Sequence, residues 1–512
     1  MSFAREELPL SQVHPPANDI AARCERKIIL LLCLLAAVHV FVFSAAFPFF
    51  NNVDEQAHFD LVVKYAQGHP PRRIEAPSAE TIPYVVIFGT REFLWPSNNF
   101  PVEQFPPPWT QPMEKIKPML LSREAAWSEV KNHEASQPPL YYALAGLWWD
   151  LGKAGGLHDG FLLYWLRFLN IIFIVTLVWI GYLAARLVFP ENKFLQISVP
   201  ALIAFIPQTA FYSIQNDVLS PLCFGAAFIC LVKFLRVEIP GVRLGTAAGL
   251  ALAATFLTKI SNLPLLAVSA AAILFKAWQL ARTGKFRAAF PSLLAVVLCA
   301  AVPMAAWLAW CKSNFGDFTG TTAKIQFLGW THKPFAEWWH HPIFTPNGLW
   351  TFLSGLMATF WQGEFLWRRQ PLSLPAVNEI YFVSSVVFIG IALLNLLPKS
   401  KTATAPQRQA LWFGFGCFTA AIAFLGFLSI IYDFQDCFYP STEHPYFTSG
   451  RLMLGALIPF LLLFAFGLDQ ALKKFGNAVK FSVLAAIILF MLATEIIIDW
   501  PVFPNPYNWF HM

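Results

Sequence analysis

Residues 28–50 read IILLLCLLAAVHVFVFSAAFPFF, and residues 51–68, NNVDEQAHFDLVVKYAQG, follow them at once. The first stretch is an apolar run without a charged residue, long enough to cross about 30 Å of hydrocarbon as a helix. Polar residues 1–27 precede it, and it lacks a small-residue cleavage site. We therefore expect a retained first membrane span, not a removed signal peptide.

The composition of the whole chain points to lipid as its solvent. Of its 512 residues, 57% are hydrophobic and 13% are charged, with a mean hydropathy of +0.53, whereas about a quarter of the residues of a soluble chain are charged. The net charge of +6 is modest, and we attribute it to cytoplasmic loops, so it predicts no nucleic-acid partner. The eight cysteines form no Cys-x-x-Cys pair that would indicate a zinc site or a disulfide framework.

About eleven runs are long enough to span a membrane. They lie at roughly 28–50, 161–189, 194–212, 217–236, 243–258, 260–281, 288–312, 376–397, 409–432, 450–470 and 478–499. One further apolar segment, residues 137–151, is short and has two prolines near its start, which suits an interfacial or re-entrant helix better than a span. The predicted fold is an all-α polytopic membrane protein.

Positive charges in the connecting loops predict the orientation. If 137–151 does not span and the N-terminus is cytoplasmic, the basic loop residues all fall on the inner side, as the positive-inside rule requires. These residues are Arg186, Lys193, Arg236, Arg243, Arg282, Lys285, Arg287, Lys399, Lys401, Arg408, Lys473, Lys474 and Lys480. The predicted parts are a cytoplasmic tail (1–27), a transmembrane module (28–312) with a large outer loop (51–160), a Trp-rich outer loop (313–375), C-terminal helices (376–499) and an outer tail (500–512).

The polar segment after the first span predicts an amphipathic helix at the outer surface. Asn51 or Asn52 is expected to cap a helix that begins at Val53. Asp54 and His58, four residues apart, share its polar face. The apolar positions, expected to press against the membrane surface, are Phe59, Val62, Val63 and Ala66. A solvated surface helix with acids matched to its dipole would explain the same pattern.

Asp54 and Glu55, directly after the first span and in front of an amphipathic outer helix, resemble the GT-C superfamily of membrane glycosyltransferases, which includes the family 39-like enzymes that use polyprenyl-phosphate sugars. Further segments that resemble this superfamily are Gln137-Pro138-Pro139-Leu140-Tyr141-Tyr142, Asn216-Asp217, Lys259 and Ser449-Gly450-Arg451. The chain is most similar to a bacterial branch of predicted membrane proteins of unknown specificity. That branch carries Asp-Glu-x-x-His-Phe, here Asp54 to Phe59, and a Trp-rich stretch, here 360–367. It often has Gln-Gly-Arg where this chain has Ser449-Gly450-Arg451.

The resemblance implies a glycosyltransferase that takes its sugar from a polyprenyl-phosphate donor at the outer face of the plasma (inner) membrane. It implies Asp54 as general base, assisted by Glu55, which would position the acceptor or help to hold a divalent metal. Arg451 and, second, Lys259 would neutralise the donor phosphate, although Lys259 also fits a lysine that snorkels from a helix end. Asp217 would orient the acceptor, a glycan, lipid or protein, or support Asp54 from across the cavity. Glu364, a polar residue beside Trp361 and Trp367, is a further candidate for acceptor binding. Asp217 also fits the N-cap of the fourth span.

A divalent metal is a further expectation for the outer face. His133 and Glu134 precede the surface helix and would complete a site with Asp54 and His58. Magnesium would want mostly oxygen ligands, whereas this mixed set also suits zinc or manganese. Most loop histidines are not ligands, and no spacing here is diagnostic.

Three other functions fit parts of the sequence. A polymerase or ligase that joins lipid-linked glycans would use the same face and the same class of donor. A transporter or flippase would place charged residues near the membrane midplane on broken helices, often in repeated halves, and no internal repeat is present. A non-enzymatic assembly subunit would not need Asp54.

Overall fold

The computed structural model describes residues 17–89, 106–367, 370–398, 400, 402–435, 437 and 439–512. Nearly all regular structure in these residues is helical, as predicted. The helices are α1 (Ala17–Ala46), α2 (Glu55–Ala66), α3 (Thr81–Phe88), α5 (Met113–Ser128), α6 (Leu140–Ala154), α7 (Asp159–Val188), α8 (Lys193–Ala204), α9 (Ser220–Arg236), α10 (Val242–Thr258), α11 (Leu263–Arg282), α12 (Phe286–Phe315), α13 (Thr321–Phe327), α14 (Pro346–Gln362), α15 (Pro375–Leu396), α16 (Ala405–Ile431), α17 (Leu457–Ala471) and α18 (Asn477–Asp499).

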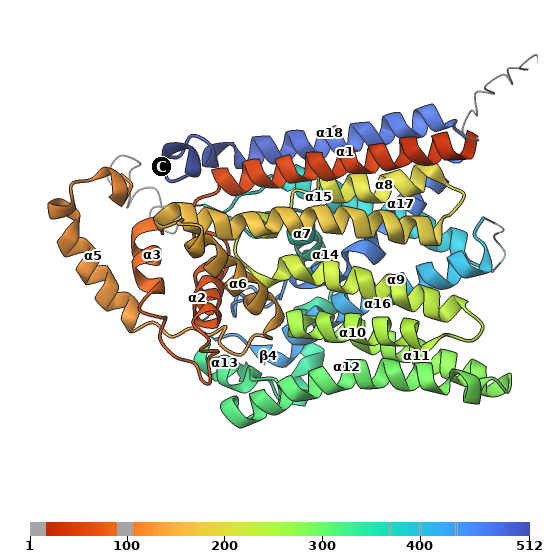
Figure 1. Ribbon diagram of the computed structural model, residues 1–512, viewed down its shortest axis with the longest axis horizontal. Helices are drawn as coiled ribbons and strands as arrows, with labels where there is room; N and C mark the ends of the chain where they lie inside the picture. Colours follow the sequence, from red (N-terminus) through yellow and green to blue (C-terminus); the bar gives the residue numbers. More distant parts are fainter. Residues whose placement is uncertain are drawn as a thin grey trace, which may run out of the picture.

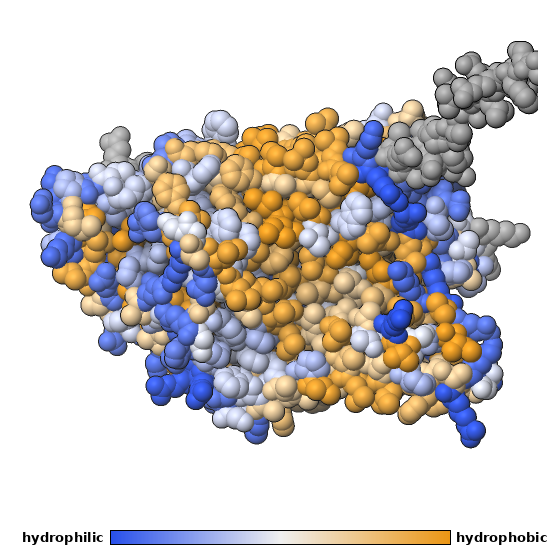
Figure 2. Space-filling model, in the orientation of Figure 1, coloured by the Kyte–Doolittle hydropathy of each residue, from blue (hydrophilic) through white to orange (hydrophobic). Residues whose placement is uncertain are grey.

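The long helices form one bundle with their axes roughly aligned (Figure 1). Among the described residues, nine helices are long and apolar enough to cross a membrane. Helices α8 and α10 are apolar as well, but shorter. Together they match the eleven predicted runs. Figure 2 shows apolar side chains over the middle of one face and hydrophilic ones toward both ends. The prediction of an all-α, multi-span membrane protein is confirmed.

The two ends of the bundle differ in what they carry. At one end lie α2, α3, α5, α6 and α13, and we call it the loop end (Figure 1). The connections that carry the described basic loop residues, such as Arg236 and Arg243 between α9 and α10, lie at the opposite end. Lys399 and Lys401 fall outside the described residues. The arrangement agrees with the parity expected from loop charge, while the cytoplasmic side remains a prediction.

The segment at 137–151 forms α6, which is not among the candidate spans of the described chain. It packs against α2 and α7. Gly146 lets α2 approach closely, because a Cβ there would lie 2.9 Å from the Ala66 nitrogen. The apolar face of α2, including Phe59 and Val62, is buried inside the protein. The expectation that this face presses against the membrane surface is therefore wrong.

The structure differs from the prediction in the extent of one helix and of one loop. The helix expected over 194–212 ends at Ala204, because Pro207 disfavours helical backbone in the residue before it. Residues 205–219 then form an irregular segment with two short 3-10 helices, η2 (Thr209–Tyr212) and η3 (Asn216–Leu219). The loop predicted over 313–375 contains α13, α14 and short 3-10 helices.

Short elements close the loop end. Two-residue strands pair as β1 (Thr331–His332) with β4 (Tyr432–Asp433), and as β2 (Leu366–Trp367) with β3 (Gln370–Pro371). The 3-10 helix η7 (Gly450–Ala456) opens the span that continues as α17. Its first residues lie against α14, since a Cβ on Gly450 would sit 2.1 Å from the Phe360 nitrogen. Only glycine fits there, and the residue after it is Arg451.

Candidate functional site

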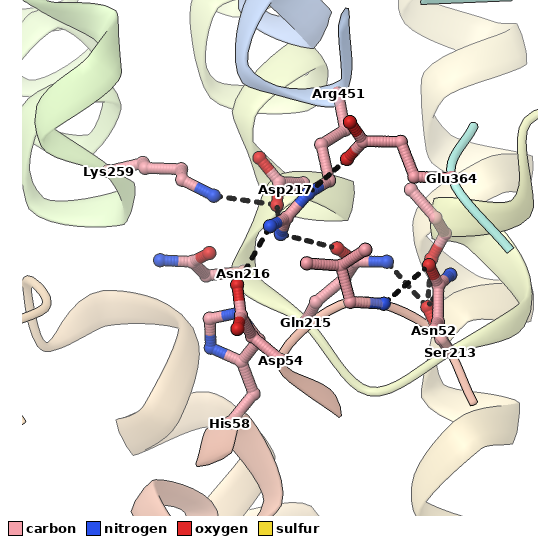
Figure 3. A network of polar contacts seen from close by, with 12 residues as sticks. Asn52, Asp54, His58, Ser213, Gln215, Asn216, Asp217, Lys259, Glu364 and Arg451 are labelled. Atoms are coloured by element: carbon pink, nitrogen blue, oxygen red, sulfur yellow. Dashed lines mark hydrogen bonds and ion pairs between the residues drawn. The ribbon is translucent and has the colours of Figure 1, made fainter. Parts of the chain in front are cut away.

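Asp54 stands immediately before α2 in a left-handed backbone conformation, with φ 63°. Helix α2 begins at Glu55, two residues later than predicted, and the Asp54 side chain makes no capping hydrogen bond. Left-handed backbone is strained for a residue with a Cβ, though aspartate and asparagine tolerate it best. It turns the carboxylate away from the helix and toward Arg451 (Figure 3).

Arg451 is the centre of the site. Its guanidinium donates to Asp54 Oδ2 at 2.9 Å, to Glu364 Oε2 at 2.8 Å and to Asp217 Oδ2 at 3.1 Å. A further bond reaches Gln215 Oε1 at 3.2 Å. Arg451 thus joins its own helix, η7, to three other segments. These are the start of α2, the end of α14, and the irregular segment before α9.

Lys259 shares Asp217 with Arg451. Its Nζ lies 2.6 Å from Asp217 Oδ2, and it occupies the extended break between α10 and α11. Lys259 and Asp217 are both buried. The pair therefore lies inside the protein, and Lys259 is not a lysine that snorkels to a surface.

Glu364 lies on the other side of Arg451 from Lys259 (Figure 3). Burial raises the pKa of its carboxyl, while the bond to Arg451 opposes that shift. The neighbouring Trp361 is buried, and its indole donates to Ser385 Oγ at 3.0 Å. This tryptophan thus belongs to the core and offers no free ring face.

His133 and Glu134 lie beside Asp54. His133 Nε2 is 3.2 Å from Asp54 Oδ1 and 3.3 Å from Glu134 Oε1, and Lys324 pairs with Glu134. Burial alone would lower the pKa of His133, but its two carboxylate partners raise it to about 9. The hydrogen bond from His133, together with Arg451, outweighs burial and holds the pKa of Asp54 below its usual range. Both carboxylates and the imidazolium are therefore charged at neutral pH.

The same three side chains could hold a metal ion. One ligand atom each from Asp54, His133 and Glu134 lies within 4.8 Å of the others. His58, the fourth predicted ligand, is not part of this group. Its Nδ1 bonds the Tyr142 hydroxyl at 2.7 Å, and burial lowers its pKa to about 4, so it is neutral at pH 7.

Three polar atoms near the centre of the site have no hydrogen-bond partner among the described residues. They are His58 Nε2, Asn216 Oδ1 and Asp217 Oδ1, all buried. Among the same residues the Tyr142 hydroxyl bonds only to His58 Nδ1, so the hydroxyl donates and the hydrogen of the ring sits on Nε2. A buried polar atom without a partner costs about 1–3 kcal/mol. One donor and two acceptors are thus free to bond a ligand or water.

Glu55 is not part of this centre. Its carboxylate is fully buried and accepts hydrogen bonds from Arg167 Nε and Nη2 at 2.8–3.0 Å. The backbone N–H groups of Phe50 and Ile214 bond it as well, at 2.8 and 3.0 Å. No acceptor position is left for a substrate. The expectation that Glu55 assists Asp54 is therefore not supported by its contacts, because both oxygens are already saturated.

Partial exposure gives access to the site from the loop end. The side chains of Asp54 and His133 are 23% and 21% exposed, whereas the other partners of Arg451 are buried. Next to His133 lies a cavity of about 160 Å³. Its lining residues include Gln56, Asp60, Trp127, Asn132 and Phe327.

Several residues of the site were not predicted from the sequence. Gln215 and Lys324 carried no motif of their own, although Gln215 directly precedes Asn216-Asp217. Tyr142 belongs to the Pro-Pro-Leu-Tyr-Tyr stretch but was given no role. Arg167 lies within a long apolar run, and a lone arginine there is a signal that it has a buried acidic partner.

Comparisons with solved structures give low scores. A crystal structure of the oligosaccharyltransferase from Archaeoglobus fulgidus, in complex with Zn and sulfate, matches with a TM-score of 0.36 and 12% identity, over 93% of this chain and 53% of that one. The archaeal oligosaccharyltransferase AglB from the same organism, in complex with an inhibitory peptide and a dolichol-phosphate, matches with a TM-score of 0.37 and 11% identity, over 93% and 55%. This chain spans about half the length of either.

Curated proteins give no significant match to this sequence. A family model does match, over residues 34–431, and its description is predicted membrane protein (DUF2142). The matched region includes Asp54, His133, Asp217, Lys259 and Glu364, and it ends before Arg451. Because the match covers most of the chain, the protein belongs to the DUF2142 family of predicted membrane proteins.

Proposed function

We propose that this protein is a membrane glycosyltransferase that moves a sugar from a polyprenyl-phosphate donor to a glycan, lipid or protein acceptor. The reaction takes place at the loop end, on the outer face of a bacterial inner membrane. The observation that carries the proposal is the position of Asp54. Its ionised, partly exposed carboxylate lies beside a buried arginine and beside buried polar atoms that lack partners.

Asp54 is the general base. As the bond between the sugar carbon and the donor phosphate breaks, a bond to the acceptor oxygen forms, and the acceptor proton passes to Asp54. A carboxylate with a lowered pKa is a weak base. The proton therefore moves late, once the acceptor oxygen has bonded to the sugar and become acidic. The other product is the polyprenyl phosphate.

Arg451 and Lys259 neutralise the departing phosphate. Arg451 has a planar fork of N–H donors. Four of its five donors are taken in the free protein, so the phosphate would exchange with one of its present partners. Among the described residues, Lys259 Nζ contacts only Asp217, so two of its three N–H donors remain for a ligand. Both cations are fixed by carboxylates before the donor arrives, and this preorganisation favours charge that develops in the transition state.

The unpartnered atoms fit the hydroxyl groups of a sugar. Asn216 Oδ1 and Asp217 Oδ1 accept hydrogen bonds, and His58 Nε2 donates one. A sugar hydroxyl can do both at once. Such a site would reject a ligand without hydroxyl groups, because these buried atoms would then stay unpaired. Glu364 acts through Arg451 and holds the guanidinium in place.

A divalent metal fits the group of Asp54, His133 and Glu134. The donor set is one imidazole nitrogen and two carboxylate oxygens, which suits manganese or zinc better than magnesium. When bound, the ion would add positive charge next to the phosphate. His133 must lose its proton to become a ligand, so affinity for the ion should rise with pH.

Mass spectrometry of surface glycans and lipid-linked sugars tests this function. Cells carry the wild-type protein, no protein, or Asp54→Asn at matched membrane levels. Asparagine tolerates the left-handed backbone at this position, so the variant removes the charge and keeps the fold. We expect a sugar increment to disappear in the null and in Asp54→Asn, while the lipid-phosphate sugar accumulates.

Asp150→Asn is the matched control, since Asp150 is an exposed aspartate on α6 at the same end of the bundle. It should leave the glycan profile unchanged. A wild-type profile from Asp54→Asn would overturn the assignment of the base and favour transport or assembly. Loss of whole glycan chains, with the individual sugar steps intact, would indicate a polymerase or ligase.

A further inference from the structure

A second buried polar cluster lies away from Arg451, where the last helix packs beside the first (Figure 1). Helix α18 contributes Glu495 and Asp499, four residues apart and so on one face. Helix α1 contributes His39, and η2 contributes Tyr212. All four residues are buried. Ionisable groups inside a membrane-spanning segment are costly and usually have a function.

His39 and Glu495 form a neutral ion pair. His39 Nε2 lies 2.8 Å from Glu495 Oε2, and Nδ1 lies 3.1 Å from the carbonyl oxygen of Ala204. The Ala204 carbonyl only accepts, so Nδ1 carries a hydrogen, and the one proton shared between Nε2 and Glu495 leaves the pair neutral overall. The Tyr212 hydroxyl donates to the other oxygen of Glu495. The charge of Glu495 is thereby balanced.

Asp499 has no such balance. Its side chain makes no hydrogen bond or ion pair that links it to another described residue, and it is only 4% exposed. Together with Glu495, Thr494 and Thr209 it lines a cavity of about 10 Å³. That volume is close to the room that one water molecule needs.

Gln362 supplies an independent sign of a ligand. It lines the same cavity, it is 9% exposed, and its Oε1 is buried without a partner among the described residues. Its Nε2 donates to Asn378 Oδ1 at 2.7 Å, so the unpaired atom is the oxygen. An unpaired acceptor and an unbalanced carboxylate therefore border a space of ionic size.

We propose that this cavity binds one monovalent cation of the sodium class, held by Asp499, the Gln362 amide oxygen and the threonine hydroxyls. Without a cation, a carboxyl group buried in this way keeps its proton. The bound cation takes the place of that proton, and its one positive charge balances the one carboxylate that His39 does not neutralise. Hard cations prefer such oxygen ligands. A divalent ion is disfavoured, because it would leave an excess positive charge beside a single carboxylate. Among the described residues, only Asp54, His133 and Glu134 form a group of three His, Cys, Asp or Glu ligands, so the cavity at Asp499 lacks the ligand set of a transition-metal site.

The cation would tie α18 to the segments that build the candidate active site. Gln362 precedes Glu364 by two residues. Thr209 accepts a hydrogen bond from Asn52 Nδ2 through its carbonyl oxygen at 3.1 Å, and Asn52 precedes Asp54 by two residues. Occupancy should therefore stabilise the protein whether or not it transfers sugars.

Thermal unfolding of the purified full chain in detergent tests the site. Sodium chloride, potassium chloride and choline chloride are compared at equal ionic strength. We expect a saturable rise of a few degrees in sodium, and none in choline, because a ligand that binds only the folded state stabilises it by mass action. Asp499→Asn should abolish the sodium dependence, whereas Glu379→Gln, an exposed carboxylate of α15, should keep it.

If Asp499→Asn fails to fold, Gln362→Met keeps the charge and should move the midpoint of the sodium titration to a higher concentration. Binding of radiolabelled sodium to the wild-type chain should saturate at one ion per chain. Equal unfolding temperatures in sodium and choline would overturn the proposal. So would an unfolding temperature that follows pH alone, because a proton shared by the two carboxylates would then explain the cluster.

Discussion

Asp54 and Glu55 are adjacent acids of equal charge, and they lie in opposite environments. Glu55 and Arg167 form a sealed pair in which every carboxylate oxygen is bonded to arginine or backbone. Asp54, partly exposed, and buried Arg451 form an open pair beside atoms that still lack partners. A saturated ion pair stabilises a fold, whereas an unsaturated one can exchange its partners for a ligand. Under the proposed function, Glu55 has a structural role and Asp54 takes part in the reaction.

The sealed pair predicts the largest effect on stability. Glu55→Gln would leave the buried Arg167 uncompensated and turn an amide toward the N–H of Phe50 or Ile214. Breaking a buried pair by removing one partner typically costs about 3–5 kcal/mol. We expect a steep fall in unfolding temperature and in membrane yield, measured on the purified chain.

The companion measurements sharpen the comparison. The double variant Glu55→Gln with Arg167→Met should recover part of the loss, since it removes the unpaired charge as well. Asp54→Asn should cost less stability than Glu55→Gln, because Asp54 is partly exposed and Arg451 keeps Asp217 and Glu364 as partners. A Glu55→Gln protein of normal stability without transferase activity would return Glu55 to the catalytic role that the sequence first suggested.

The open pair predicts a pH dependence instead. The pKa of His133 is raised from 6.5 to about 9 by Asp54 and Glu134. A group whose pKa is raised by folding stabilises the folded state fully below its unfolded pKa. This stabilisation is lost as the pH rises through the folded pKa. It amounts to up to about 3 kcal/mol.

Unfolding temperatures between pH 6.5 and 9 measure this effect, in the presence of a chelator so that metal binding does not compete. The wild-type chain should lose stability across this window, and His133→Gln should lose less. His158→Gln is a suitable control, because His158 is an exposed histidine of the same end. Equal slopes for wild type and His133→Gln would mean that Asp54 and Glu134 do not hold the proton of His133.

Most of the fold was readable from the sequence, because hydropathy is a local property. An apolar run of sufficient length has to be a helix in lipid, whatever its neighbours are. The failures lie where tertiary contacts decide. Helix α14 was predicted as loop, since its apolar turns sit in a Trp-rich segment that the loop parity placed outside. The face of α2 was assigned to the membrane, since α6, its actual partner, is distant in sequence.

The candidate site was readable only in part. The predicted topology placed Asp54, Asp217, Lys259 and Arg451 on one side of the membrane, because every second loop between spanning helices lies on the same side. The pairings among these residues were not readable. A backbone angle of φ 63° at Asp54 turns two neighbouring carboxylates apart, and no local pattern announces it. Gln215 and Lys324 were missed because each joins the site through contacts distant in sequence.

The packing that aims Arg451 predicts the smallest of these effects. Gly450→Ala would place a Cβ 2.1 Å from the backbone nitrogen of Phe360, so η7 and α14 must move apart. Overpacking of this kind costs about 1–3 kcal/mol. The displacement also moves the guanidinium away from Asp54, so transfer activity should fall more than stability does. Gly390→Ala on α15 meets nothing within 4 Å and should leave both unchanged. If Gly450→Ala lowers the unfolding temperature and leaves activity intact, the open pair tolerates displacement, and Arg451 balances charge there without orienting the reacting groups.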